Sequence, residues 1–222
     1  MVMLQRWHEI SFFHWSCDPA ILKPRLPDGI ALDTFDGRAW ISLTPFLLCG
    51  LRPPLVPRLL GLDFPETNLR TYVVGAEGPG IWFFSLDAAR RIAVAAARAS
   101  YGLPYFWARM RVVIGQTQNE YFSSRRGRAN ATIKIEKGDP ILQQSSLDVF
   151  LTARFRLYSI WAGLLITAEV QHAPWDLAQV RILQFEENVR RAMGVEFPSK
   201  DFVAHFSTGV DARIGRPTCS IM

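Results

Sequence analysis

Cysteine is scarce in this chain, and its three cysteines form no recognisable pattern. Cys17, Cys49 and Cys219 are far apart in the sequence and odd in number. Small secreted domains that depend on disulfides carry closely spaced, paired cysteines, so the sequence does not indicate that class. We therefore expect free thiols and a cytoplasmic location.

Long hydrophobic runs are absent as well. No charged segment followed by an apolar run opens the chain, so we predict no signal peptide. A membrane-spanning helix needs roughly 20 consecutive apolar residues. The longest candidate, residues 43–60, is interrupted by Arg52, Arg58 and several prolines. We therefore predict no membrane partner.

Motifs for metals, nucleotides and nucleic acids are also missing. The four histidines are scattered, without the His-x-His or H-E-x-x-H spacing of metal ligands. The glycine-rich segment 75–80 opens no helix, and we predict a turn there rather than a phosphate-binding loop. The one dense basic patch, residues 123–128, is narrower than a nucleic-acid-binding face. We predict no metal, no cofactor and no nucleic-acid partner.

The composition is that of a globular protein. Hydrophobic residues make up 49% of the 222 residues and charged residues 20%, which supports a sizeable core. The length fits one domain, residues 1–222. Fifteen glycines and fourteen prolines, spread along the chain, indicate many short elements joined by turns.

Strands dominate the predicted elements, and the turn signal Asp36-Gly37 predicts a hairpin. The strands are predicted at residues 7–15, 30–35, 38–48, 68–74, 81–85, 106–114, 119–124, 129–136, 155–161, 164–172 and 177–185. Helices are predicted at residues 88–100, capped by Asp87, at 146–154, capped by Ser146, and at 186–193. The pattern predicts an α+β fold that is mostly β, with a barrel or strongly curved sheet.

Six segments together resemble a known family. In order along almost the whole chain, they are similar to the YqjF-like bacterial proteins, a family of unknown function. The segments are residues 10–15, 33–40, 64–73, 83–87, 103–105 and 172–175. That family more distantly resembles the acetoacetate decarboxylase-like superfamily. The resemblance implies a curved sheet that forms a cone-shaped barrel around a buried small-molecule site.

The resemblance also implies which catalytic groups are kept and which are lost. Decarboxylases of this superfamily carry a Schiff-base lysine after a proline, and the matching segment 102–106 has Tyr105 and Phe106 at those positions. A second superfamily segment supplies an active-site acid, and it matches residues 64–67, which contain Glu66. The acid is kept and the nucleophile is replaced.

None of the chain's four lysines is expected to replace the missing nucleophile. Lys134 lies on the predicted strand face opposite Ile133 and Ile135, which indicates exposure to solvent. Lys137 borders a turn and is expected to be exposed, and Lys23 and Lys200 lie in loop-like segments. Since an imine requires a neutral amine in the site, we predict lysine-free chemistry.

The strand that begins at Glu66 carries the candidate site. Glu66, Asn68, Arg70 and Tyr72 have even spacing and therefore share one face. From the pattern alone this polar face would point to water, whereas the resemblance favours the interior. An interior Glu66 would serve as acid or base with Tyr105 as a hydrogen-bond donor, and Arg70 would anchor a carboxylate, with Asn68 and Tyr72 as further ligand contacts.

Three further residues are candidate ligand contacts. Arg125 is matched to an arginine of the family near the predicted hairpin tip, and a place near the pocket mouth is one interpretation. His172 shares a strand face with apolar residues, and both a site role and a structural role remain open. Trp175 follows it, and a core position is the alternative to a ligand contact.

The function that these residues favour is binding of, or catalysis on, a small ligand that carries a carboxylate or carbonyl group. Whether the protein turns its ligand over is left open by the sequence. The alternatives are a non-catalytic sensor or carrier with the same pocket, and a protein–protein interaction module that uses the proline-rich segment 45–57. A homo-oligomer is compatible with each of them.

Overall fold

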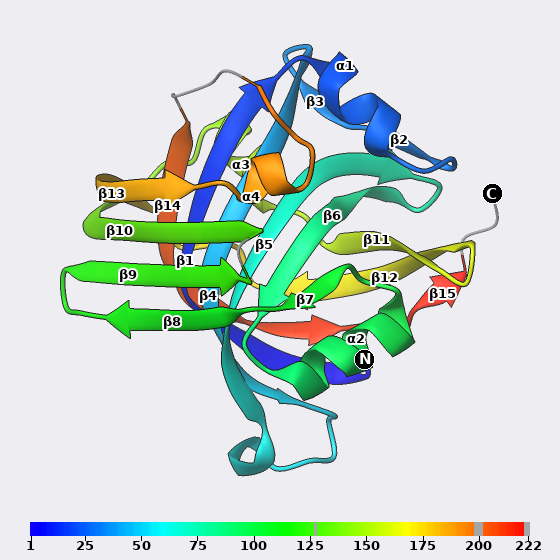
Figure 1. Ribbon diagram of the computed structural model, residues 1–222, viewed down its shortest axis with the longest axis horizontal. Coiled ribbons are helices and arrows are strands. Elements are labelled where there is room, and N and C mark those ends of the chain that lie inside the picture. Colours follow the sequence, from blue (N-terminus) through cyan, green and yellow to red (C-terminus); the bar gives the residue numbers. More distant parts are fainter. Residues whose placement is uncertain (127, 198–201, 220–222) are drawn as a thin grey trace.

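The structure is a computed structural model that describes residues 1–126, 128–197 and 202–219 (Figure 1). Its strands are β1 (Met3–Cys17), β2 (Ile30–Leu32), β3 (Thr34–Phe35), β4 (Arg38–Arg52), β5 (Leu62–Gly75), β6 (Gly78–Ala88), β7 (Tyr105–Trp107), β8 (Arg109–Ile114), β9 (Gln118–Arg125), β10 (Ala129–Pro140), β11 (Arg156–Trp161), β12 (Leu164–His172), β13 (Ala178–Glu187), β14 (Val203–Ile214) and β15 (Thr218–Cys219). The helices are α1 (Pro19–Leu22), α2 (Arg91–Tyr101), α3 (Ser146–Thr152) and α4 (Val189–Ala192), with 3₁₀ turns at Lys23–Arg25 and Arg58–Leu60.

All of these strands belong to one sheet, which is strongly curved. The main path runs β15-β12-β11-β6-β5-β4-β1-β14-β13-β10-β9-β8, and β12 also pairs with β14. In Figure 1 the strands β8, β9, β10 and β13 lie across the direction of β1, β4 and β5. The predicted mostly-β, curved-sheet fold is thereby confirmed.

The long strands β1, β4, β5 and β6 have two differently used faces, because neighbouring side chains in a strand point to opposite sides. One face packs against β9, β10 and β13 and forms the largest apolar core, with Phe13, Leu43 and Leu69 from the long strands and Ile133 and Ile135 from β10. Part of the other face lines a cavity.

All three predicted helices have boundaries that differ from the predicted ones. Helix α2 begins at Arg91 and not after a cap at Asp87, because β6 extends to Ala88 and pairs there with Glu66 of β5. Helix α3 is capped by Ser145 instead of Ser146: the Ser145 hydroxyl accepts from the Asp148 amide, and the Asp148 carboxylate accepts from the Ser145 amide. This capping box fixes the entry into α3.

Both predicted turns are confirmed. The β3–β4 hairpin turns at Asp36 and Gly37, whose φ values of 50° and 71° are of the kind that a type I′ turn requires. β5 and β6 pair up to Gly75 and Gly78 in the glycine-rich segment. Within the described part of the chain, none of the helices has the length and apolar character that a bilayer crossing requires.

Candidate functional site

The even-numbered residues of β5 point into the cavity. Glu66, Asn68 and Arg70 all line it, together with residues of β1, β4, β6, α2 and β12. The next residue of this face, Tyr72, is fully buried and directs its hydroxyl toward α3. The strand alternation therefore gives all four residues one face, and tertiary packing makes that face interior.

Glu66 is a buried carboxyl group that forms no ion pair with any cation in the described part of the chain. It is 3% exposed, and its Oε2 accepts a hydrogen bond of 2.9 Å from the Tyr105 hydroxyl. Burial raises the pKa of Glu66 to about 8, although hydrogen bonds from Tyr105 and Asn68 oppose the shift. At neutral pH the protonated form therefore predominates, and Glu66 is an acid that can donate a proton in the cavity.

Tyr105 takes part in the same contact. Burial and the neighbouring Glu66 raise the pKa of its hydroxyl well above the ordinary value. The hydroxyl thus keeps its proton and acts as a hydrogen-bond donor. The structure brings together Glu66 and Tyr105, which are separated by 39 positions in the sequence.

Arg70 is a cation that faces the cavity. Among the described residues no carboxylate forms an ion pair with it, and its Nε has no hydrogen-bond partner. Its guanidinium lies 5.5 Å from the centre of the Phe12 ring. Burial lowers the pKa of Arg70, whereas a hydrogen bond with Tyr72 raises it. A partly buried cation without an acidic partner loses some of its hydration without compensation, and an anionic ligand would offset that loss.

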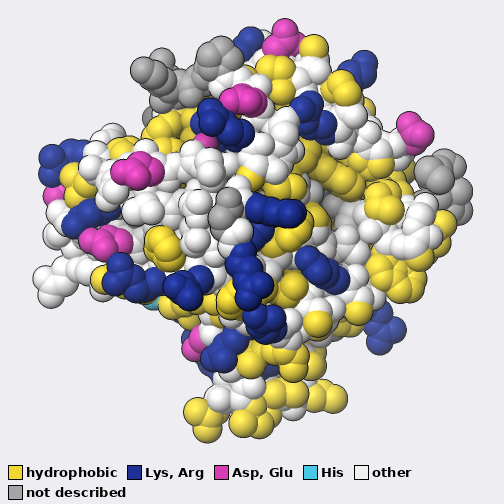
Figure 2. All heavy atoms as spheres, viewed as in Figure 1, with side chains coloured by type: hydrophobic (Ala, Val, Ile, Leu, Met, Phe, Trp, Pro, Cys, Tyr) yellow, Lys and Arg dark blue, Asp and Glu magenta, His cyan; other side chains and the backbone are white. Residues whose placement is uncertain are grey.

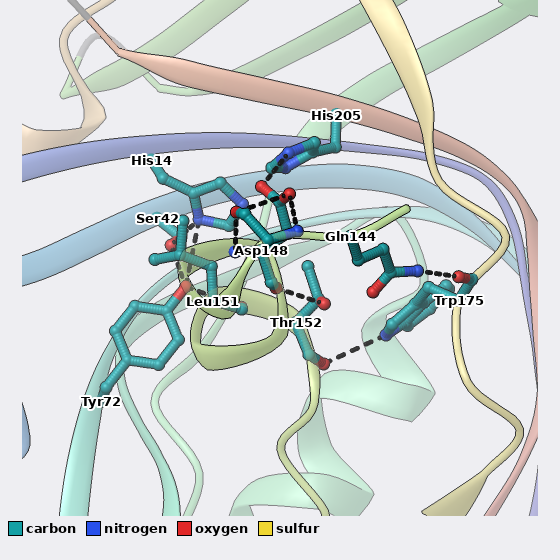
Figure 3. A network of polar contacts seen from close by, with 10 residues as sticks. His14, Ser42, Tyr72, Gln144, Asp148, Leu151, Thr152, Trp175 and His205 are labelled. Carbon is teal, nitrogen blue, oxygen red and sulfur yellow. Dashed lines mark hydrogen bonds and ion pairs between the residues drawn. The ribbon is translucent and has the colours of Figure 1, made fainter. Parts of the chain in front are cut away.

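A polar network fixes the Tyr72 side chain (Figure 3). The Tyr72 hydroxyl donates to the Leu151 carbonyl of α3 over 2.9 Å and lies 2.6 Å from the Ser42 hydroxyl. Ser42 in turn lies 2.5 Å from Nδ1 of His14. Burial lowers the pKa of His14 well below its usual range, so this imidazole is neutral. The network ties β1, β4 and β5 to α3.

The cavity wall next to α3 holds His172 and Trp175. Nδ1 of His172 is 2.7 Å from the Ala173 carbonyl, and burial lowers the pKa of His172. Trp175 is buried, donates from Nε1 to the Thr152 carbonyl over 3.2 Å, and stacks on Trp7 at 5.9 Å. Both residues line the cavity, and both also have the structural contacts that a core position requires.

The sequence missed two arginines in the cavity wall. Arg154 follows α3 and donates to Asp33 over 2.6 Å, and Arg156 opens β11 with its Nε 3.8 Å from Glu77. Arg154 was expected to be the last residue of a helix, and no local pattern distinguishes it from a surface arginine. Only the packing of α3 against β5 places it here.

Arg125 lies apart from the other predicted site residues. Its guanidinium pairs with the buried carboxylate of Asp87, stacks on the Phe106 ring at 3.9 Å, and does not line the cavity. The reason is the parity of β9, whose odd-numbered side chains face the core on the other side of the sheet. The predicted place near the pocket mouth is therefore wrong.

The residues that line the cavity include no lysine. Lys134 pairs with Glu120 at the surface, as expected. Lys137 was predicted to be exposed, and this prediction is wrong. Its ammonium group lies 2.7 Å from the buried Glu9 and donates to the Gly115 carbonyl. Lys23 is exposed in a 3₁₀ turn, and Lys200 lies outside the described residues.

The cavity has a volume of about 140 Å³, and most of its wall is apolar. Phe46 and Leu48 of β4 and Phe64 of β5 are buried in this wall, and α2 contributes alanines. A concave, mostly apolar cavity with a few convergent polar groups is the usual form of a small-molecule site. In the described residues no group of three potential metal ligands occurs.

Comparisons with known proteins agree with this architecture. The model of the family DUF2071, described as an uncharacterized conserved protein, matches residues 4–211. The chain is 38% identical over 216 residues to the uncharacterized protein YqjF of Bacillus subtilis (strain 168), a match that covers 95% of this chain and 89% of that protein.

Solved structures with low sequence identity share the fold. The enduracididine biosynthesis enzyme MppR in complex with pyruvate has a TM-score of 0.69 at 12% identity, covering 98% of this chain and 90% of that chain. Acetoacetate decarboxylase from Legionella pneumophila has a TM-score of 0.69 at 14% identity, covering 97% and 87%. At this identity the likeness shows an acetoacetate decarboxylase-like fold and nothing finer.

Proposed function

The chain belongs to the DUF2071 family of uncharacterized conserved proteins, and we propose that it binds a small carboxylate- or carbonyl-bearing molecule in its interior cavity. The observation that carries the proposal is Arg70, a cation that faces the cavity without an acidic partner among the described residues. Guanidinium groups bind carboxylates through paired, charge-assisted hydrogen bonds. The neighbouring Glu66, protonated at neutral pH, can donate to a carbonyl oxygen of the same ligand.

The chemistry that we propose does not use a lysine imine. In the resemblance described above, the superfamily uses a Schiff-base lysine and Tyr105 matches its position, and none of the described residues that line the cavity is a lysine. Borohydride treatment in the presence of acetoacetate should therefore leave the mass of the protein unchanged. A covalent adduct on any lysine would refute this part of the proposal.

Ligand binding is tested directly with pyruvate and acetoacetate as probes. Calorimetry should detect binding of these acids to the wild type. The Arg70→Met variant should bind them with an affinity at least tenfold lower, because the ion pair between Arg70 and the ligand carboxylate disappears together with its hydrogen bonds. Lys134→Met is the matched control, since it removes a surface cation far from the cavity wall. Equal affinity of the Arg70→Met variant and the wild type would contradict the proposed role of Arg70.

A carrier or sensor without turnover is the alternative that the missing lysine favours. Glu66→Gln separates the two functions, since an enzyme that uses Glu66 as acid would lose rate while it keeps its ligand. A carrier has no rate to lose, so the variant would show only a modest change in affinity. Three free cysteines fit the cytoplasmic location that we predict for either function.

A protein–protein contact is favoured by one separate observation. The loop between β4 and β5 projects from the molecule (Figure 1), and its Leu55 and Leu59 are 98% and 93% exposed. Figure 2 shows apolar side chains gathered on this projection. A second copy of the chain would cover them, which predicts a homo-oligomer. A monomer in light scattering at about 100 μM, which would place any dissociation constant above that range, would count against this alternative.

A further inference from the structure

We infer that the ligand of the cavity is a monocarboxylic acid with an apolar body of about six carbon atoms. The inference rests on the function proposed above and narrows it from any small carboxylate or carbonyl compound to one class. It follows from three features: the charges that line the cavity, its apolar wall, and the alanines of α2 at its rim.

The charges favour a single anionic group. Three arginines line the cavity, but Arg154 is paired with Asp33 and Arg156 lies near Glu77. Only Arg70 has no acidic partner among the described residues. A dicarboxylate would bring a second negative charge for which no unpaired cation is available, and burying it would be costly. Glu66 is neutral at pH 7 and does not repel the single carboxylate.

The apolar part of the cavity wall, which is the larger part, favours a ligand with an apolar body. Phe46, Leu48 and Phe64 offer no hydrogen-bond donor or acceptor from their side chains, and all three are at most 3% exposed. A hydroxyl or amide of a ligand against this wall would lose its hydrogen bonds to water without replacement. Methylene groups or an aromatic ring would instead gain from burial there.

The volume of the cavity indicates the size of the apolar part of the ligand. The cavity of about 140 Å³ is close to the size of an engineered cavity of about 150 Å³ that stays dry and binds benzene. A two-carbon or three-carbon acid would leave much of the apolar wall without contacts. A long fatty acyl chain would exceed the space.

Helix α2 forms part of the cavity wall, and it does so with alanines, whose side chains are small. Ala93, Ala96 and Ala97 line it and are spaced so that they share one helix face. Ala99, on the same helix, is exposed and does not line the cavity. Larger side chains at the lining positions would fill the space that we assign to the ligand body.

The test is a calorimetric series of straight-chain carboxylates from acetate to decanoate, with benzoate as an aromatic probe. Each methylene group buried in the wall should improve affinity about fourfold. We expect hexanoate and benzoate to bind on the order of 100-fold more tightly than acetate, with no further gain beyond about eight carbons. Ala97→Leu should weaken the binding of hexanoate at least fivefold more than that of acetate, whereas Ala99→Leu should change the binding of neither.

The outcomes separate this inference from the function proposed above. If acetate and hexanoate bind equally, or if Ala97→Leu leaves hexanoate binding unchanged, the inference that the ligand has an apolar body is refuted. The proposal of a carboxylate-binding site would still stand. If no acid in the series binds, or if all bind the Arg70→Met variant as well as the wild type, both conclusions fail. The series on the wild-type protein decides the inference even if Ala97→Leu does not fold.

Discussion

Glu66 and Asp87 lie almost beside each other on the paired strands β5 and β6, yet they face opposite sides of the sheet. Both are at most 3% exposed, and burial raises the pKa of both. Asp87 has Arg125 as its ion-pair partner and a hydrogen bond from Ser123, which counteract the shift. Glu66 has only the neutral hydroxyl of Tyr105 and the amide of Asn68.

The arginines show the same contrast. Arg125 is held between Asp87 and the Phe106 ring, whereas Arg70 faces the cavity without a carboxylate among the described residues. On the packed face every charge that we compare has its partner within the protein. On the cavity face the acid keeps its proton and the cation lacks a counter-ion. Paired charges satisfy one another within the fold, so that removing one partner is costly, and unpaired groups facing a cavity are those available to a ligand.

Breaking the ion pair between Asp87 and Arg125 should have the largest effect on stability. Arg125→Ala leaves the Asp87 carboxylate buried and unpaired, and we expect it to lower the free energy of unfolding by about 3 to 5 kcal/mol. Urea denaturation measures the change. Lys134→Ala removes half of an exposed ion pair and should cost about 1 kcal/mol or less. Similar losses in both variants would contradict the contrast that we draw.

Glu66, which has no ion-pair partner among the described residues, should make the stability of the protein depend on pH. Its pKa is about 8 in the folded chain against 4.5 for an ordinary glutamate, so the folded state binds this proton more tightly. The stability that goes with the protonated carboxyl is fully present below pH 4.5 and is lost as the pH rises toward 8. From pH 5 to pH 7 the loss amounts to about 2 to 3 kcal/mol.

Glu66→Gln should remove this component, because an amide does not titrate. The difference in free energy of unfolding between the variant and the wild type should therefore grow in favour of the variant as the pH rises from 5 to 7. Denaturation at a series of pH values measures it. A constant difference across this range would mean that Glu66 titrates as an ordinary surface carboxyl does.

The smallest expected effect comes from the contact between Glu66 and Tyr105. Tyr105→Phe removes a hydrogen bond that lowers the pKa of Glu66, so the pKa of this carboxyl should rise further. The loss of one hydrogen bond should lower stability by about 1 kcal/mol. Carboxyl titration by NMR follows the pKa. A pKa of Glu66 that falls in this variant would show that the hydroxyl does not act on the carboxyl as described.

Local pattern was sufficient for some parts of the site. The alternation of β5 correctly placed Glu66, Asn68 and Arg70 on one face, because a strand allows its side chains only two directions. The resemblance to the YqjF-like family predicted Glu66 and Tyr105 in one site, and a hydrogen bond joins them in the structure. The match of Tyr105 to the superfamily's lysine position stays a prediction. The direction in which the face points was open from the pattern alone, since a polar face usually points to water.

Other parts could not be read from local sequence. Asp87 carries a helix-cap signal, but pairing with β5 extends β6 through that position, and tertiary contacts override the local preference. Lys137 borders a turn, yet it pairs with Glu9, which lies near the start of the chain. Arg154 enters the cavity wall only because α3 packs next to β5.

The sequence by itself determined the types of chemical group that are available on one face of a strand, an acid and an arginine, and it contains no metal-ligand motif. The resemblance added the prediction that a tyrosine stands where relatives have a lysine. Only the tertiary structure decided which of these groups are buried and which have partners. The physical reason is that strand parity is a property of the local backbone. Desolvation and charge pairing depend on residues far apart in the sequence, and they separate the protonated Glu66 from the paired Asp87.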